Sequence, residues 1–124
     1  MLRILIADDH PAMRKAIVAL ISDEFDEVFI GEAVDGLDLI DKALAVEWHL
    51  IVSDLYMPGK NGLQALTAIR HEKVNQPFVV ISSYSERVYS TPVMDAGAND
   101  FIGKDDLSSE LIPSIRRIVG DLIS

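Results

Sequence analysis

The hydrophobic residues of this chain follow two alternating patterns. Short apolar runs rich in Val and Ile predict strands, and those in the middle of the chain lack alternation, which is typical of strands covered on both faces. The predicted strands are Leu2–Ala7, Val28–Val34, Leu50–Ser53, Phe78–Ser82 and Phe101–Gly103. The segments between them have helical period, most clearly in the first, whose apolar residues are Met13, Ala16, Ile17, Leu20 and Ile21.

The predicted helices have recognisable starts. Pro11 suits the first turn of the first helix, and the second and third helices follow Asp35-Gly36 and Asn61-Gly62. Their apolar positions are Leu37, Ile40 and Leu44 in the second helix and Leu63, Leu66 and Ile69 in the third. The last helix is marked by Leu107, Leu111, Ile115, Ile118 and Leu122, with Asp105 or Asp106 available as its cap.

Pro92 interrupts the region of the fourth helix. A proline removes a backbone donor and clashes with the preceding turn. We therefore expect this helix to be short, to be kinked, or to begin near Thr91-Pro92, and we expect Gly97 to close it.

Strand and helix alternate five times, which predicts an α/β domain with a parallel sheet. A length of 124 residues with 49% hydrophobic content suits one domain over residues 1–124.

The absence of cysteine excludes disulfides and thiolate metal sites. The apolar start meets Asp8-Asp9 too soon to form a signal peptide or a membrane span. A net charge of −9 makes nucleic acid an unsuitable partner for this domain by itself.

Polar side chains follow four of the five predicted strands. The first strand ends in Asp8-Asp9, the third in Asp54 and the fourth in Ser82-Ser83, and the fifth leads to Lys104. Parallel sheets bind ligands beyond the carboxyl ends of their strands. Three carboxylates there would repel one another unless a hard cation such as Mg²⁺ were bound. Lys104 and the Ser82 hydroxyl would suit a phosphoryl group on an acid.

Each of these residues also has a purely structural interpretation. Asp8-Asp9 could cap the first helix, Asp54 could form a turn before Pro58-Gly59, and Lys104 could be a solvated surface residue. Ser82 could be a hydrogen-bonded hydroxyl at a strand end. Their joint occurrence at strand ends favours a functional site.

The motifs "ADDHP", "DLYMPGKNG" and "GANDFIGK", with a serine after the fourth strand, resemble a response-regulator receiver domain of two-component signalling. With "GEAVDG", they are particularly similar to receivers of the NarL/LuxR type. The resemblance runs from Leu2 to about Leu122. It implies a flavodoxin-like (βα)5 three-layer sandwich with strand order 2-1-3-4-5.

The resemblance also implies roles for the site residues. Asp54 would accept a phosphoryl group from a histidine kinase or a phosphotransfer protein. Asp9, Asp54 and the main-chain carbonyl of Tyr56 would hold Mg²⁺ directly, and Asp8 would act through a water. Lys104 would neutralise phosphoryl oxygens.

The same resemblance implies a conformational switch. Ser82 would move toward the new phosphate, and Phe101 would turn inward with it, although an aromatic in a short strand is equally explained as core. The signal would leave through the face made by the fourth helix, the fifth strand and the last helix. Tyr56 and Tyr84, with Ser83, would flank the site, and the tyrosines would slow attack by water.

The chain departs from the family's pattern in two places. Asp105 stands where the family often has a proline in a cis peptide bond, so we expect no cis-proline there. Pro92 lies in the helix that usually moves. The histidines His10, His49 and His71 lack metal-ligand spacing and are interpreted as ordinary, and Trp48 as packing at the end of the second helix.

Other functions compete with this interpretation. A Mg²⁺-dependent phosphohydrolase with an aspartyl nucleophile would need an acid two residues after Asp54, where Tyr56 stands. A flavin or nucleotide carrier would need a Gly- or Ser/Thr-rich loop in place of "DDHPAM". A receiver-like interaction module that is never phosphorylated would be favoured only if site residues were missing, and none is.

We expect a cytoplasmic signalling domain rather than an enzyme. This domain would support its own phosphoryl transfer and dephosphorylation, and it would have no membrane partner. It is either a stand-alone receiver that acts through protein contacts or a fragment of a transcription factor whose DNA-binding domain would follow Ser124, and we favour the fragment. Homodimerisation on phosphorylation is compatible with both.

Overall fold

The chain folds as the alternating series that its sequence predicts. The computed structural model describes residues 1–120, apart from the side chains of residues 84–86. Its elements in order are β1 (Leu2–Ala7), α1 (Pro11–Glu24), β2 (Val28–Ala33), α2 (Gly36–Ala45), β3 (Leu50–Asp54), α3 (Gly62–Glu72), β4 (Phe78–Ser82), the 3₁₀ helix η1 (Tyr84–Tyr89), α4 (Ser90–Asp95), β5 (Asp100–Gly103), the 3₁₀ helix η2 (Lys104–Asp106) and α5 (Leu107–Val119). Each predicted strand is present within one residue of its predicted bounds.

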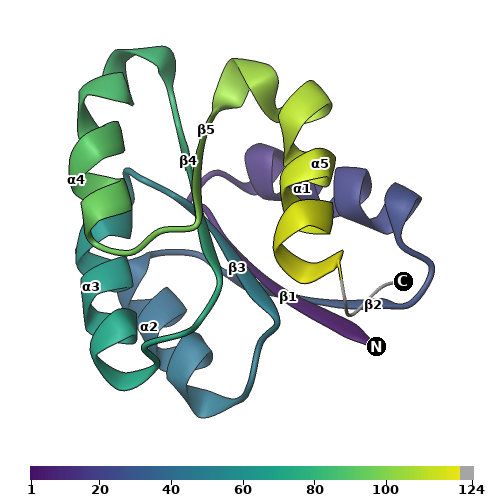
Figure 1. Cartoon of the computed structure of the whole chain (residues 1–124), viewed down its shortest axis with the longest axis horizontal. Coiled ribbons are helices and arrows are strands. Elements are labelled where there is room, and N and C mark those ends of the chain that lie inside the picture. Colours follow the sequence, from purple (N-terminus) through teal and green to yellow (C-terminus); the bar gives the residue numbers. More distant parts are fainter. Residues whose placement is uncertain (121–124) are drawn as a thin grey trace.

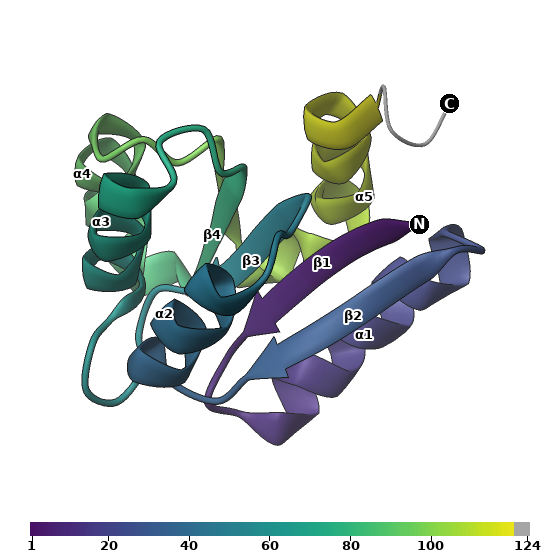
Figure 2. The same ribbon diagram turned by 90° about the horizontal axis from the view of Figure 1, so that it is seen from below.

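The strands form one parallel sheet in the order β2-β1-β3-β4-β5, which confirms the expected order. Helices cover both faces of the sheet: α1 and α5 lie on one side and α2, α3 and α4 on the other (Figures 1 and 2). Because all strands run the same way, their carboxyl ends meet at one edge. This edge carries the residues that the sequence predicts to be functional.

Two hydrophobic cores hold the three layers together. Successive residues of β3 point into opposite cores, with Ile51 in the core under α2, α3 and α4 and Val52 in the core under α1 and α5. Both side chains are fully buried. The uninterrupted apolar runs in the sequence thus reflect strands covered on both faces.

Helix α2 is confirmed, but its buried face is not the one that Leu37 and Leu44 indicate. Leu37 and Leu44 are 56% and 39% exposed, whereas Leu39 and Ala43 are fully buried and Gly36 is also buried. Small residues on the inner face allow α2 to approach its neighbours closely, so tertiary packing sets its rotation.

The fourth helical region is short, as Pro92 predicts. A 3₁₀ helix, η1, leads into α4, which begins at Ser90 and ends at Asp95. Gly97 closes it with a φ of 106° and donates its N–H to Met94 O at 3.0 Å. This positive φ favours glycine over other residues.

The expected cap of α5 is confirmed in its position but not in a side-chain hydrogen bond. Asp106 occupies the N-cap position, but its side chain makes no capping hydrogen bond. The preceding 3₁₀ turn gives Asp106 a φ of −105° and a ψ of 4°, away from the extended conformation of capping residues. Its carboxylate instead lies 3.9 Å from the Arg87 guanidinium. Leu122, expected in this helix, lies outside the described residues.

Trp48 packs after α2, as predicted. Its indole N–H donates to Lys42 O at 3.0 Å, and its ring stacks on Phe29 with centroids 6.1 Å apart. The Arg3 guanidinium lies over both rings, 4.7 and 5.1 Å from their centroids. This stack lies at the amino ends of the strands, opposite the edge with the acidic residues.

Asp100 fastens α5 to β5. Its Oδ2 accepts hydrogen bonds from Ser114 Oγ at 2.7 Å and from Arg117 at 2.8 Å, and its Oδ1 accepts one from the Phe101 N–H. Burial acts to raise the pKa of Asp100, but these hydrogen bonds and the positive charge of Arg117 outweigh it and lower the pKa below the usual value. The ionised carboxylate therefore stabilises the fold.

We expect Asp100→Asn to lower the free energy of unfolding at neutral pH by on the order of 1 kcal/mol, because the half-exposed carboxylate is screened by solvent. A lowered pKa gives stability that is present above the unfolded-state pKa and is lost as the pH falls through the folded-state pKa. The difference from wild type should therefore shrink at acidic pH. Urea denaturation across pH measures this, with exposed Asp105→Asn as the control. A difference independent of pH would contradict the prediction.

Candidate functional site

Adjacent strands carry the acidic residues to one place. Asp8 directly follows β1, Asp54 ends β3, and the two strands pair with Ala7 opposite Ser53. Asp8 and Asp54 are buried, at 0% and 2% exposure, and the Asp9 side chain is 27% exposed. The sheet register thus places three carboxylates together at its carboxyl edge.

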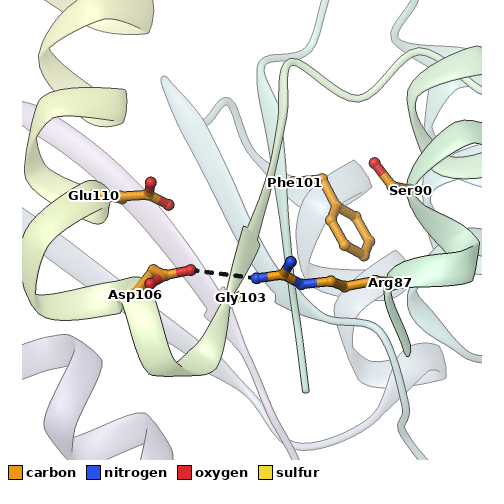
Figure 3. Close-up of a pocket in the computed structure, with 6 residues that line it drawn as sticks. All are labelled: Arg87, Ser90, Phe101, Gly103, Asp106 and Glu110. Atoms are coloured by element: carbon orange, nitrogen blue, oxygen red, sulfur yellow. Dashed lines mark ion pairs between the residues drawn. The ribbon is translucent and has the colours of Figure 1, made fainter. Parts of the chain in front are cut away.

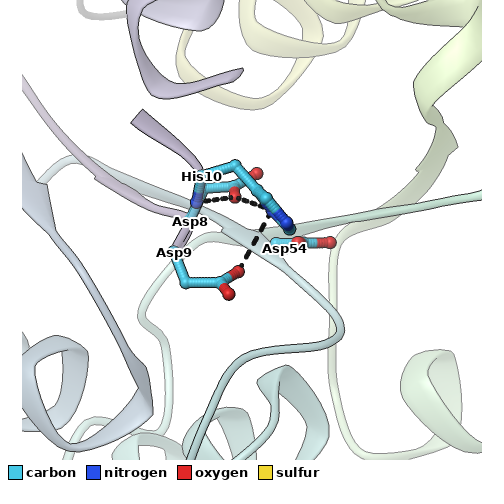
Figure 4. Close-up of side chains that lie close together, drawn as sticks. All are labelled: Asp8, Asp9, His10 and Asp54. Carbon is cyan, nitrogen blue, oxygen red and sulfur yellow. Dashed lines mark hydrogen bonds and ion pairs between the residues drawn. The ribbon is translucent and has the colours of Figure 1, made fainter. Parts of the chain in front are cut away.

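These carboxylates form a compact cluster with a histidine. One potential ligand atom from each of Asp8, Asp9, His10 and Asp54 lies within 4.8 Å of all the others (Figure 4). Among the described residues, the buried Oδ2 of Asp8 has no hydrogen-bond partner. Buried carboxylate oxygens are costly unless a partner or a cation satisfies them. The cluster therefore fits a divalent cation held mainly by oxygen ligands.

Lys104 completes the cluster on the side of β5. It is the first residue of η2, and its Nζ donates to Asp54 Oδ2 at 3.2 Å. Its side chain is 22% exposed, so it reaches inward from the surface along its aliphatic stem. The structure thus brings Lys104 to Asp54, although 50 residues separate them in the sequence.

Ser82 ends β4, the strand next to Asp54. It is fully buried, and its hydroxyl donates to the Ser83 carbonyl at 3.3 Å. Its neighbour in β5 is Gly103, the residue before Lys104. The strand order therefore places Ser82 between Asp54 and Lys104, where its movement toward a phosphate stays a prediction.

Tyr56 lies beside the site and contacts a residue that the sequence did not indicate. Its hydroxyl donates to the Tyr89 hydroxyl at 3.2 Å, and the two rings meet edge to face with centroids 6.0 Å apart. This contact joins the loop after Asp54 to the end of η1. Tyr84, the other predicted flanking residue, belongs to η1, but its side chain lies outside the described part of the structure.

Phe101 lies apart from the acidic cluster, in a hollow between η1, α4 and α5 (Figure 3). The residues lining this hollow are Arg87, Ser90, Phe101, Gly103, Asp106 and Glu110. Phe101 is half-buried and packs against the core under α2, α3 and α4. Its ring points toward the side of Ser90 and Arg87 (Figure 3). An inward turn from this position stays a prediction.

The sequence interpretation treats His10 as an ordinary residue, but the structure places its ring against the acidic pair. Its Nδ1 lies 3.1 Å from Asp8 Oδ1 and 3.2 Å from Asp9 Oδ1. The sequence held one signal: His10 directly precedes Pro11 and so occupies the N-cap position of α1, next to the strand end. The sequence contains no comparable signal for Tyr89, which contacts Tyr56, or for Arg87, which lies near Asp106. Only the tertiary fold brings these pairs together.

No helix within residues 1–120 combines the length and the apolar character that crossing a membrane requires.

The sequence profile described as "Response regulator receiver domain" matches residues 4–116. The chain is 33% identical over 116 residues to the nitrate/nitrite response regulator protein NarP of Escherichia coli. This alignment covers 92% of this chain and 53% of NarP. It is 32% identical over 118 residues to the transcriptional regulatory protein LiaR of Bacillus subtilis. This alignment covers 94% of this chain and 55% of LiaR.

A similar solved structure is the response regulator protein TrrA of Thermotoga maritima in complex with Mg²⁺-BeF. It aligns with a TM-score of 0.85 at 25% identity, covering 95% of this chain and 99% of that chain. The present chain spans about half the length of NarP and of LiaR. The profile match, the strand order and the cluster of aspartates agree, and the chain belongs to the response regulator receiver domains of two-component signalling.

Proposed function

We propose that Asp54 is the phosphoacceptor and that a histidine kinase or a phosphotransfer protein is the donor. The supporting observation is that Asp54 ends β3 with one carboxylate oxygen 3.2 Å from Lys104 Nζ and lies within the acidic cluster. In the transfer, an Asp54 oxygen bonds to phosphorus while the bond from phosphorus to the donor nitrogen breaks, and the electron pair stays on that nitrogen. The product is an acyl phosphate.

Lys104 and Ser82 would bind the transferred group. The Lys104 ammonium would exchange its contact with Asp54 for the phosphoryl oxygens and neutralise their charge. The Ser82 hydroxyl, which now donates to the Ser83 carbonyl, would rotate to donate to a phosphoryl oxygen. Both residues act by positioning and charge, which suits phosphoryl transfer because little other covalent chemistry is required.

Asp9, Asp54 and the Tyr56 carbonyl would hold Mg²⁺, and Asp8 would act through a water. The buried Asp8 Oδ2 supports this assignment, as does the Mg²⁺-BeF complex of the similar protein TrrA. When bound, Mg²⁺ offsets the repulsion among the carboxylates and the incoming phosphoryl oxygens.

The output would be carried by the face formed by α4, β5 and α5. Phe101 and the hollow beside it lie on this face. NarP and LiaR are named as regulators and are about twice as long as this chain, which supports control of a DNA-binding module, with homodimerisation as one route. A helix-turn-helix encoded in the same gene would support this output, and a gene that encodes only the receiver would contradict it.

The lifetime of the acyl phosphate would depend on Tyr56. Tyr56 is 49% exposed and its hydroxyl is held by Tyr89, so the side chain can obstruct water approaching Asp54. Tyr84 would also slow the attack of water.

Incubation with acetyl phosphate and Mg²⁺ tests the proposed phosphorylation. Intact mass is expected to show the addition of one phosphoryl group. Chelation of divalent ions should slow this addition by about a hundredfold or more, because the ion supplies several kcal/mol of charge stabilisation. No adduct with Mg²⁺ present would overturn the proposal, and an equal rate with chelator would overturn its metal requirement.

A further inference from the structure

The His10 ring lies against the acidic cluster rather than on the open surface. Figure 4 shows it pointing toward the carboxylates of Asp8 and Asp9, with Asp54 close by. Its Nδ1 is within 3.2 Å of an oxygen of each member of the acidic pair. When the ring proton is on Nε2, Nδ1 carries a lone pair and is a metal ligand of a different kind from the oxygens around it.

The main chain of residues 8–10 holds the ring in this direction. His10 occupies the N-cap position of α1 with φ −96° and ψ 112°, and its side chain makes no capping hydrogen bond. Its N–H donates to Asp8 Oδ1 at 2.8 Å, and Arg14 donates to the Asp8 carbonyl. Pro11 fixes the next residue at the start of the helix. The ring is thus preorganised toward the cluster, while 66% exposure leaves it room to adjust.

A second observation points to a ligand between these residues. The Asp8 side chain is 1% exposed, and its Oδ2 lacks a hydrogen-bond partner among the described residues. A buried carboxylate oxygen in this state requires a donor or a cation. The nearest ring nitrogen approaches the other oxygen of Asp8, so it does not satisfy this one.

We propose that His10 Nδ1 is a direct ligand of the divalent cation, in addition to Asp9, Asp54 and the Tyr56 carbonyl, while Asp8 acts through a water. This inference rests on the proposed function, in which the acidic cluster holds such a cation. An imidazole nitrogen adds little affinity for Mg²⁺, which prefers oxygen ligands, but it adds affinity for Mn²⁺ and later transition ions. The site is therefore a mixed oxygen and nitrogen site that selects Mn²⁺ over Mg²⁺ more strongly than carboxylates alone would.

Electron paramagnetic resonance of Mn²⁺ added to the full chain tests this assignment. The signal of free Mn²⁺ measures its affinity, competition by Mg²⁺ measures selectivity, and electron spin echo modulation detects a coordinated nitrogen. Wild type should show nitrogen modulation that changes when histidine is labelled with nitrogen-15. In His10→Ala the modulation should disappear, and the Mn²⁺ affinity should fall about tenfold or more while the Mg²⁺ affinity changes by less than about threefold.

His71→Ala is the matched control, because its ring is exposed on α3 and lies 3.4 Å from Glu72. It should keep the modulation and the Mn²⁺ affinity of wild type. Mn²⁺ that binds without nitrogen modulation, or modulation that persists in His10→Ala, would overturn the role of His10 and leave the acidic site intact. If Mn²⁺ and Mg²⁺ both fail to bind wild type, the proposed metal site itself is wrong.

Discussion

Replacing Asp54 with asparagine is expected to abolish phosphorylation by acetyl phosphate while the fold is retained. The amide has nearly the same shape as the carboxylate but cannot form the acyl phosphate. The substitution also removes one of the three negative charges in the acidic cluster. This decreases the repulsion among the carboxylates when no metal ion is bound. Intact mass should show one phosphoryl adduct on wild type and none on the variant.

Two further variants sharpen this test. Asp54→Ala should likewise give no adduct, which shows that the loss does not depend on the amide. Asp105→Asn changes an exposed aspartate next to Lys104 and should keep the wild-type adduct. An adduct that persists in both Asp54 variants would mean that another side chain is the nucleophile.

Gly62→Ala is expected to lower the free energy of unfolding by about 3 kcal/mol or more, at the upper end of the cost of overpacking. An added Cβ would lie 2.5 Å from the main-chain oxygen of Asp54 and 3.0 Å from the Leu55 Cα. Both are main-chain atoms and cannot rotate away. Gly62 also donates its N–H to Leu55 O at 2.6 Å, so α3 cannot retreat without losing this bond. Urea denaturation followed by circular dichroism measures the loss.

The same substitution should also slow phosphorylation, because the clash falls on the backbone that carries Asp54. Gly120→Ala is the matched control: an added Cβ there meets nothing within 4 Å, and the residue has a helical φ of −53°. We expect it to change stability by less than about 1 kcal/mol. Equal stability of the two alanine variants would refute the close approach of α3 to β3.

The glycine at the start of α2 has a similar role. A Cβ on Gly36 would overlap the main-chain oxygen of Lys60. The loop between Asp54 and α3 is therefore bounded by Gly62 at its end and by Gly36 along its length. The two glycines allow this loop to lie close to the sheet, which fixes the residues that follow the phosphoacceptor.

Much of the fold and of the site follows from local pattern. The apolar runs predict all five strands, most clearly β3 and β4, which are buried on both faces, and the common direction of parallel strands places Asp8, Asp54 and Lys104 at one edge. Convergence of strand ends is a property of the topology, so it requires no side-chain detail. The alternation of strands and helices in the sequence is therefore enough to predict at which edge of the sheet the site lies.

The remaining features depend on rotations that the pattern does not encode. Leu37 and Leu44 have the helical spacing of a buried face, but α2 instead turns Gly36, Leu39 and Ala43 toward the core. The side-chain direction of His10 depends on the extended backbone before Pro11, and Asp106 lost its capping geometry to a 3₁₀ turn. The rotation of α2 reflects tertiary packing, and the other two outcomes each reflect the backbone conformation of a single residue.

Two prolines show how the same residue type can have different consequences. Pro92 lies near the start of a short helix, as expected, whereas Pro113 lies inside α5. An interior proline costs about 3 kcal/mol or more in a helix. Helix α5 tolerates it because Leu111 and Ile115 on its inner face are fully buried and Pro113 lies on its exposed side.

The stack of Arg3, Phe29 and Trp48 gives the molecule a built-in optical reporter. Trp48 is the single tryptophan of the chain and lies two residues before the start of β3, which Asp54 ends. Six residues of extended chain place about 20 Å between the indole and the acidic cluster. Paramagnetic or phosphorylating ligands at the cluster should leave its emission nearly unchanged, whereas unfolding will expose it to water. Fluorescence can therefore follow the stability of this domain without interference from the chemistry at its other end.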